Sequence, residues 1–209
     1  MKSTLAFIFL FVVYSGLTQT HAVTETGDEV ILYDDGSWSF LDGDLEAEDA
    51  EIPINESSFE KDKKSTFQIK SKKLDVGLSI NPKEWSFSRS TDNESAEFEF
   101  QMKGEDLYGM MITEKFEIPL ETLKQIALDN ARSAANDIQL MKEEYRMVNG
   151  VKVLMMQIKG SIQGIKFIYF GYYYSSSMGT VQLVSYTGEG LFEEYYDKAE
   201  IFLNGFEEL

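Results

Sequence analysis

Carboxylates are the chemically active side chains that this sequence offers in quantity, with 36 Asp and Glu residues. Two carboxylic acids can carry out acid and base catalysis in a glycosidase. No spacing selects one such pair here, and no combination of nucleophile, base and orienting residue is recognisable. The acidic turns Asp34-Asp35 and Asp42-Gly43-Asp44 could bind calcium, but neither has the spacing and closing Glu of a calcium loop. We expect solvated turns there, with no catalytic and no metal site.

Imidazole and thiol chemistry is almost absent. The chain has no cysteine and a single histidine, His21, which lies in an N-terminal segment that we expect to be removed. A mature chain without these side chains cannot form a catalytic triad based on histidine, a zinc site of histidine or thiolate ligands, or a disulfide. We therefore expect no cofactor and a non-catalytic role.

Methionine and aromatic side chains could form a binding site of another kind. Met110-Met111 and Met155-Met156 could supply thioether ligands to copper. Neighbours on a strand point to opposite faces, however, so core packing is the preferred interpretation of these pairs. The aromatic run Tyr172-Tyr173-Tyr174 could fill the core or line a groove for a ligand or peptide. Core packing is preferred here too, and the groove is the alternative.

One strand decides how these aromatic residues are positioned. Ile165–Tyr174 has apolar side chains on both faces, which is typical of a strand covered on both sides. It belongs to a meander of four strands over 143–187. Its first reversal is predicted at Asn149-Gly150, because both central residues of a type I′ turn need positive φ. The other reversals are predicted at Gly160–Gly164 and Ser175–Gly179. The latter tip is the expected binding surface, because loops on a rigid sheet commonly carry function.

Shorter strands and two helices are predicted around the meander. Alternating apolar residues predict strands at 73–80, 84–87, 96–102 and 108–116. Pro119 suits the first turn of a helix, and a second helix over 190–203 should end in a glycine cap at Asn204-Gly205 with Phe206 packed beyond it. The fold class is therefore α+β, a central and mainly antiparallel sheet with helices packed on its faces. The apolar stripe of the first helix comprises Leu120, Leu123, Ile126, Ala127, Ala131, Ala134 and Ile138.

Three segments precede this main domain, which is expected to span 67–209. Residues 1–22 have a basic start, a short apolar run and a small-residue end, which is typical of a signal peptide cleaved after Ala22. The run is shorter than the roughly 20 residues that span a bilayer. We therefore expect a secreted or periplasmic protein without membrane insertion after cleavage, and an uncleaved anchor is the alternative. Residues 23–41 should form a β-hairpin, and residues 42–66 a flexible linker, first acidic and then basic.

The order of these elements supports a comparison at the level of fold. Trp85 follows a turn, Phe98-Glu99-Phe100 lies in the next strand, and a long helix, Val148-Asn149-Gly150-Val151 and a closing helix ending at Leu203-Asn204-Gly205-Phe206 come after it. Over residues 67–206 this pattern resembles the PsbP-like α/β/α fold family, and the Asp34-Asp35-Gly36-Ser37-Trp38 turn resembles a "DDGTW" hairpin of secreted bacterial proteins. Known PsbP-like proteins are mostly non-enzymatic accessory or binding proteins, so the resemblance implies that role. Their binding residues do not map onto this sequence.

The charge of the chain narrows the range of partners. A formal net charge of −17 argues against nucleic acid and against anionic membrane surfaces. We expect a secreted, non-catalytic binding or accessory module that contacts an unidentified protein partner. The alternative is a carrier of a small molecule or of calcium, with an aromatic or carboxylate-lined cleft.

Overall fold

The chain divides into two units, residues 1–51 and residues 52–209, and each is described by itself. The structure is a computed structural model. It describes residues 20–23, 29–32, 38–40, 51–90, 95–135 and 137–209.

The first unit contains a three-stranded antiparallel sheet. Its strands are β1 (Thr20–Val23), β2 (Glu29–Leu32) and β3 (Trp38–Phe40), and β2 pairs with both of the others. The pairing of β2 with β3 is the one that a hairpin over 23–41 requires. The predicted cleavage point after Ala22 falls within β1. Most of the predicted signal peptide and both acidic turns lie outside the described residues.

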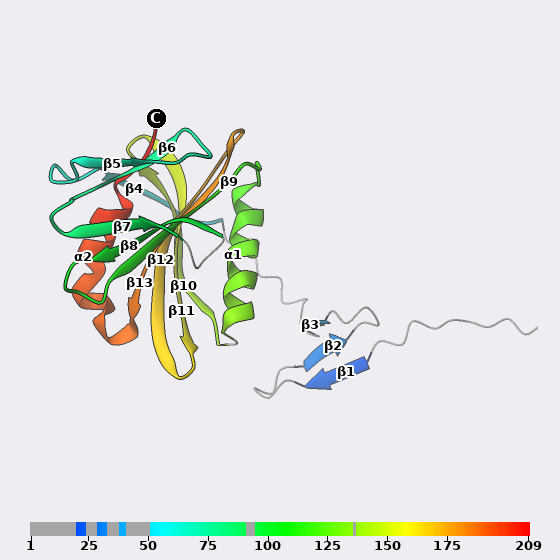
Figure 1. Cartoon of the computed structure of the whole chain (residues 1–209). Helices are drawn as coiled ribbons and strands as arrows, with labels where there is room; N and C mark the ends of the chain where they lie inside the picture. Colours follow the sequence, from blue (N-terminus) through cyan, green and yellow to red (C-terminus); the bar gives the residue numbers. More distant parts are fainter. Residues whose placement is uncertain (1–19, 24–28, 33–37, 41–50, 91–94, 136) are drawn as a thin grey trace, which may run out of the picture. The chain divides into compact units, whose positions relative to one another are not determined.

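An eight-stranded sheet forms the centre of the second unit (Figure 1). Every neighbouring pair is antiparallel except β4 and β10, which run parallel. The long strands of the predicted meander, β10 to β13, occupy the middle of the sheet. In spatial order the strands are β4 (Ile54–Phe59), β10 (Gln139–Val148), β11 (Val151–Ile162), β12 (Ile165–Ser176), β13 (Gly179–Gly188), β9 (Tyr108–Glu114), β8 (Ala96–Met102) and β7 (Trp85–Arg89).

The edge strand β4 corrects the prediction of a flexible linker over 42–66. β4 lies within that range and pairs with β10, with Phe59 opposite Val148. Phe59 is buried, and its carbonyl accepts a hydrogen bond from the Asn149 backbone N–H (2.9 Å). An edge strand needs few apolar side chains, because the ladder and one buried ring hold it in place. The low apolar content of this segment indicated a linker, but the segment contains a strand.

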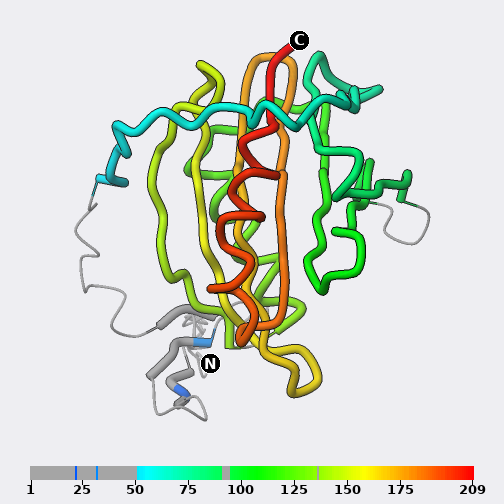
Figure 2. Tube along the Cα trace, turned by 90° about the vertical axis from the view of Figure 1, so that its left-hand side faces the viewer, coloured from blue at the N-terminus to red at the C-terminus, as the bar shows by residue number. Residues whose placement is uncertain are grey.

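Two helices cover opposite faces of the sheet (Figure 1). α1 (Leu120–Ala134) packs against β12 on one face. α2 (Phe192–Leu203) follows a short 3₁₀ helix, η1 (Glu189–Leu191), and runs lengthwise over the other face (Figure 2). The prediction that β12 is covered on both sides is confirmed. Phe170 and Tyr172 lie in the core beneath α2, and Tyr173 lies in the core beneath α1.

A small second sheet completes the cover on the α2 side. It has the order β14-β6-β5 and consists of β5 (Phe67–Lys70), β6 (Val76–Ile80) and β14 (Phe206–Glu208). The strand predicted over 73–80 therefore starts at Val76. The chain that follows β4 passes close to the C-terminal segment (Figure 2), where Lys61 Nζ lies 3.1 Å from Glu207 Oε2.

The first two reversals of the meander have positive φ angles at both central residues. Asn149 (φ 49°) and Gly150 (φ 84°) form the predicted turn. The second reversal is confined to Gln163 (φ 52°) and Gly164 (φ 81°), and Gly160 lies inside β11 instead. The third lies at Ser177-Met178, between the end of β12 and the start of β13.

The glycine cap predicted at Asn204-Gly205 does not have the left-handed conformation that usually makes glycine necessary at a helix end. α2 ends at Leu203 with Asn204 as its C-cap residue (φ −66°), and Gly205 is not among the glycines with positive φ. A Cβ at position 205 would lie 2.0 Å from the carbonyl oxygen of Ser79. Glycine is required there because the chain passes against β6, where the Ser79 N–H donates to the Gly205 carbonyl (2.8 Å). Phe206 is buried beyond it, as predicted.

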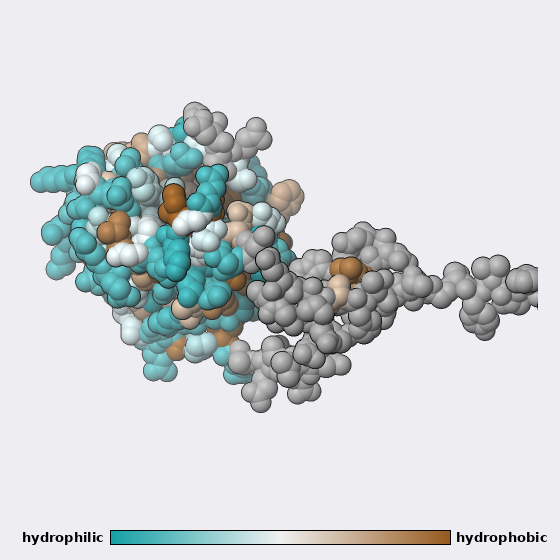
Figure 3. Space-filling view, turned by 90° about the horizontal axis from the view of Figure 1, so that it is seen from below, coloured by the Kyte–Doolittle hydropathy of each residue, from teal (hydrophilic) through white to brown (hydrophobic). Residues whose placement is uncertain are grey.

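None of the helices in the described ranges is both long and apolar enough to cross a bilayer. Figure 3 shows one face of the molecule, on which hydrophilic side chains predominate and hydrophobic ones are scattered. Scattered apolar residues are ordinary on a protein surface.

Candidate functional site

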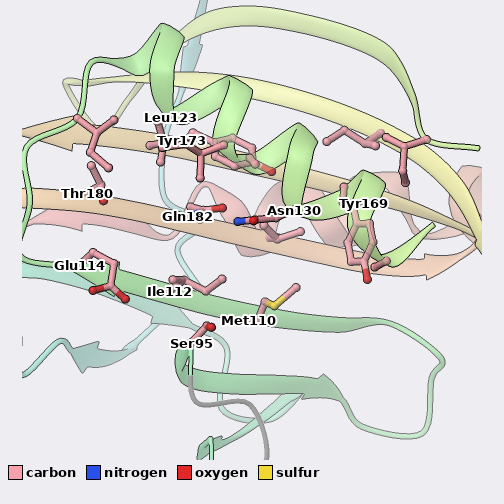
Figure 4. Close-up of a pocket in the computed structure, with 18 of the residues that line it drawn as sticks. Ser95, Met110, Ile112, Glu114, Leu123, Asn130, Tyr169, Tyr173, Thr180 and Gln182 are labelled. Carbon is pink, nitrogen blue, oxygen red and sulfur yellow. The ribbon is translucent and has the colours of Figure 1, made fainter. Parts of the chain in front are cut away.

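A cleft of about 590 Å³ lies between α1 and the sheet (Figure 4). One wall is α1, and the floor is formed by β9, β11, β12 and β13. Its volume falls within the range of small-molecule sites, roughly 300–1,000 Å³. The lining is mainly apolar and comprises Ser95, Met110, Ile112, Glu114, Ile118, Leu123, Ile126, Ala127, Asn130, Ala131, Ala134, Ile138, Ile158, Ile162, Phe167, Tyr169, Tyr173, Thr180, Gln182 and Val184.

The cleft exists because the apolar stripe of α1 is wider than its contact with the sheet. Leu123 and Leu128 are buried against the sheet, whereas Ile126 is 38% exposed. Ala131 and Ala134 continue the stripe along the cleft, and their short side chains leave space unfilled. The predicted helix stripe is therefore correct from Leu120 to Ala134, but part of it lines a cavity rather than the core, and Ile138 lies beyond the end of α1. Leu128, which is buried, was missed.

The floor of the cleft combines aromatic and aliphatic side chains. Phe167 and Tyr169 of β12 make an edge-to-face contact, with ring centroids 4.8 Å apart. Both are half-buried, and Met110 and Ile112 extend the apolar floor onto β9. Apolar side chains around a few polar groups are the usual composition of a small-molecule site.

The run Tyr172-Tyr173-Tyr174 divides between the two faces of the sheet. Tyr172 and Tyr174 are buried in the core on the α2 side, as preferred from the sequence. Tyr173 lines the cleft and is also 96% buried, with 4% exposed. Burial raises the pKa of the Tyr173 and Tyr169 hydroxyls, so both are neutral at physiological pH. Neither hydroxyl has a hydrogen-bond partner among the described residues.

Polar groups are few in the cleft and nearly all are uncharged. Asn130, Thr180 and Gln182 contribute amides and a hydroxyl (Figure 4). Among the described residues, Glu114 is the one carboxylate of the lining, and its Oε1 lies 3.8 Å from Lys73 Nζ. The described lining contains no lysine and no arginine.

The methionine pairs lie as the strand geometry predicts. Met111 and Met155 pack beneath α2, and Met110 and Met156 pack on the α1 side. Their sulfurs are therefore separated by the sheet. Across the ranges that the structure describes, no group of three or more His, Cys, Asp or Glu residues is arranged to hold a metal ion. The tip Ser175–Gly179, which was expected to form the binding surface, contributes no residue to the lining of the cleft. The next residue in the chain, Thr180, does line it.

Solved structures with a similar fold were found by comparison. The solution structure of the cyanobacterial PsbP protein (CyanoP) from Synechocystis sp. PCC 6803 covers 68% of this chain and 92% of that one, with a TM-score of 0.53 and 11% identity. The fold is PsbP-like. This likeness confirms the predicted fold class and resemblance.

Other similar structures match less closely. LpqN of Mycobacterium tuberculosis, described as involved in cell envelope biogenesis, has 11% identity and a TM-score of 0.45 over 67% of this chain and 88% of that one. PA94 of Pseudomonas aeruginosa, a protein of unknown function described as a regulator candidate, has 9% identity and a TM-score of 0.40 over 63% and 89%. No protein-family model and no curated protein matches the sequence.

The PsbP-like domain also contains a buried charged cluster that sequence reasoning missed. Arg146 of β10 is 2% exposed, and its Nε donates to Glu144 Oε1 (2.6 Å). Its Nη1 donates to the Tyr172 hydroxyl (3.0 Å) and to Glu200 Oε1 (2.8 Å) on α2. The guanidinium also lies over the Phe59 ring, 4.2 Å from its centroid. These contacts connect the edge strand, the sheet and α2.

Each charge in this cluster is compensated. Burial alone would lower the pKa of the Arg146 guanidinium, but the Tyr172 hydroxyl and the Glu144 carboxylate hold that pKa above its ordinary value. Burial would raise the pKa of Glu144, but hydrogen bonds from Asn55, Lys142 and Arg146 lower it overall. Both groups are therefore charged and paired. The cluster is satisfied within the protein, which indicates a structural brace rather than a binding site.

Proposed function

We propose that this protein is a non-catalytic binding module that holds an apolar small molecule in the cleft beside α1. The observation that carries the proposal is the lining, in which aromatic and aliphatic side chains enclose a volume suited to a small ligand. The N-terminal sequence, with its pattern of a signal peptide, supports a role outside the cytoplasm. The unit that acts there is the PsbP-like domain.

A binding role suits the cleft better than a catalytic one. Glu114 is the single carboxylate among the described residues of the cleft and lies near Lys73, so no second acid of the described lining accompanies it. The tyrosine hydroxyls of the lining have raised pKa values and are poor bases at neutral pH. The side chains therefore supply shape and apolar contact rather than proton transfer.

We predict saturable binding of the neutral fluorescent probe N-phenyl-1-naphthylamine, with a rise in its emission. Replacing Ala131 with phenylalanine fills the cleft and should weaken this binding at least tenfold (about 1.4 kcal/mol). The matched control is Gln125→Phe, which adds the same ring to an exposed position of α1 outside the lining. A fluorescence titration measures both variants. Equal losses in the two variants, or no saturable binding by the unaltered protein, would refute the proposal.

A second candidate function, contact with a protein partner, is favoured by the open edge of the sheet at β7. β7 is the last strand in the sheet order and pairs only with β8 among the described strands. Phe87 on this strand is 42% exposed, and its ring lies 5.6 Å from that of Phe67, which is 44% exposed. An exposed edge with an apolar side chain is the surface to which a partner can add a strand.

The backbone of β7 is oriented for such an addition. At the start of the pair the Lys103 N–H donates to the Glu84 carbonyl (2.8 Å). Because hydrogen-bonded positions alternate along an antiparallel pair, the main-chain groups of Phe87 and Arg89 are directed away from β8.

We predict that Phe87→Lys abolishes capture of a stoichiometric partner by immobilised protein under mild crosslinking. A lysine at the edge discourages strand addition. Phe116→Lys is the matched control, because Phe116 is also strongly exposed but lies outside β7. Capture that is lost in both variants, or retained in both, argues against this edge as the partner site.

A further inference from the structure

We infer that the ligand of the α1 cleft is an uncharged, mainly apolar molecule whose carbonyl or hydroxyl oxygen accepts a hydrogen bond from the Tyr173 hydroxyl. The inference rests on the proposed function and specifies its ligand class. Two features of the cleft support it: a donor in its lining without a partner among the described residues, and the absence of cations from the described lining.

The Tyr173 hydroxyl is a hydrogen-bond donor in the lining of the cleft. The side chain is 4% exposed and lies in the cleft beneath α1 (Figure 4). Within the described part of the chain, its hydroxyl donates to no other group, unlike the hydroxyls of Tyr172 and Tyr174, which bond to Asn204 and Glu208. The hydroxyl oxygen is not among the fully enclosed polar atoms that lack a partner, so it is accessible from the cleft. A ligand oxygen placed against Tyr173 can therefore accept a hydrogen bond from this hydroxyl.

The charge of the cleft selects against an anionic ligand. Glu114 is the only charged side chain among the described residues of the lining, and the whole chain has a net charge of −17. A carboxylate ligand would lose its hydration without gaining a cation, which is strongly unfavourable. The neutral amides of Asn130 and Gln182 and the hydroxyl of Thr180 can instead hydrogen-bond an uncharged polar group.

The test compares three ligands of equal chain length: decane, 2-decanone and decanoate. Each displaces N-phenyl-1-naphthylamine from the unaltered full chain at pH 7, where decanoate is charged. We expect 2-decanone to displace the probe at a concentration at least tenfold below that of decanoate. Tyr173→Phe should weaken 2-decanone binding by about 3- to 10-fold, the value of one hydrogen bond, and change decane binding less than about twofold.

Tyr174→Phe is the matched control, because Tyr174 lies on the other face of the sheet and its hydroxyl bonds to Glu208. It should leave all three affinities unchanged. Tyr173→Phe keeps the ring and removes a hydroxyl that has no partner, so we expect it to fold.

The outcomes distinguish failure of the proposed binding function from failure of the inferred ligand class. Failure of N-phenyl-1-naphthylamine to bind overturns the binding function and this inference with it. Binding of the probe with equal displacement by decanoate and 2-decanone overturns the inference alone. The same conclusion follows if Tyr173→Phe leaves 2-decanone binding unchanged, or weakens decane and 2-decanone equally.

Discussion

Replacing Arg146 with methionine is expected to lower the free energy of unfolding by about 3–5 kcal/mol, the usual cost of removing one partner from a buried ion pair. The guanidinium is 2% exposed and donates to Glu144, Glu200 and Tyr172. Without it, the Glu144 carboxylate remains buried with only Asn55 and Lys142 beside it. The expected loss therefore comes mainly from an uncompensated charge, since methionine fills much of the same volume.

Urea unfolding followed by tryptophan fluorescence measures this effect, because Trp85 stacks on Phe202 in the core, with ring centroids 4.3 Å apart. The matched control is Arg132→Met. Arg132 pairs with Asp129 at 3.1 Å, but both side chains are more than half exposed. Exposed pairs contribute little, so we expect a change within about 0.5 kcal/mol.

A double variant tests the physical cause. In Arg146→Met with Glu144→Gln, the buried carboxylate is replaced by a neutral amide, so part of the lost stability should return. If the double variant is less stable than Arg146→Met alone, the uncompensated charge is not the cause, and the apolar contact of the guanidinium with Phe59 becomes the better explanation.

The central fold could be predicted from the sequence because its signals are local. Ile165–Tyr174 is apolar on both faces and is covered on both faces. Asn149-Gly150 forms the predicted turn, because few residues other than Asn and Gly accept its angles. In both cases the residue types alone indicate the local environment: burial on both faces for the strand and positive φ angles for the turn.

Features that depend on partners distant in the chain were not predictable. β4 contains few apolar residues, and its place in the sheet depends on β10, nearly 90 residues later, as the contact between Asn55 and Glu144 shows. Arg146 looks like a solvent-exposed charge on a strand until Glu200 and Tyr172 are brought beside it. No local pattern contains that information.

Only part of the candidate site could be predicted from the sequence. The aromatic run indicated either core or groove, and the structure assigns Tyr173 to the cleft and its two neighbours to the opposite core. The other wall includes Ile126 and Ala131, which belong to the predicted apolar stripe of the helix. Periodicity shows that a helix face is apolar, but it does not show how much of that face the sheet covers.

Replacing Gly205 with alanine is expected to lower the free energy of unfolding by more than about 3 kcal/mol. Overpacking a core side chain typically costs about 1–3 kcal/mol. Here the new Cβ would lie 2.0 Å from the Ser79 carbonyl oxygen, and a backbone atom cannot turn aside as a side chain can. Relief would require separating the end of α2 from β6, which also disturbs the pairing of Phe206 with Leu78.

Urea unfolding again provides the measurement. Gly190→Ala is the matched control, because a Cβ at Gly190 meets no atom within 4 Å. We expect that variant to change stability by less than about 1 kcal/mol. A Gly205→Ala protein within about 1 kcal/mol of the unaltered one would contradict the close approach of the two backbones.

Gly205→Asn separates the two explanations for a glycine at the end of a helix. If Gly205 were needed for a left-handed cap, asparagine would be the best-tolerated replacement, because it enters that conformation more readily than alanine. Since the φ angle of Gly205 is not positive and the obstacle is the Ser79 carbonyl, asparagine should be at least as damaging as alanine. The order of the two variants therefore shows whether backbone conformation or backbone proximity makes glycine necessary at this position.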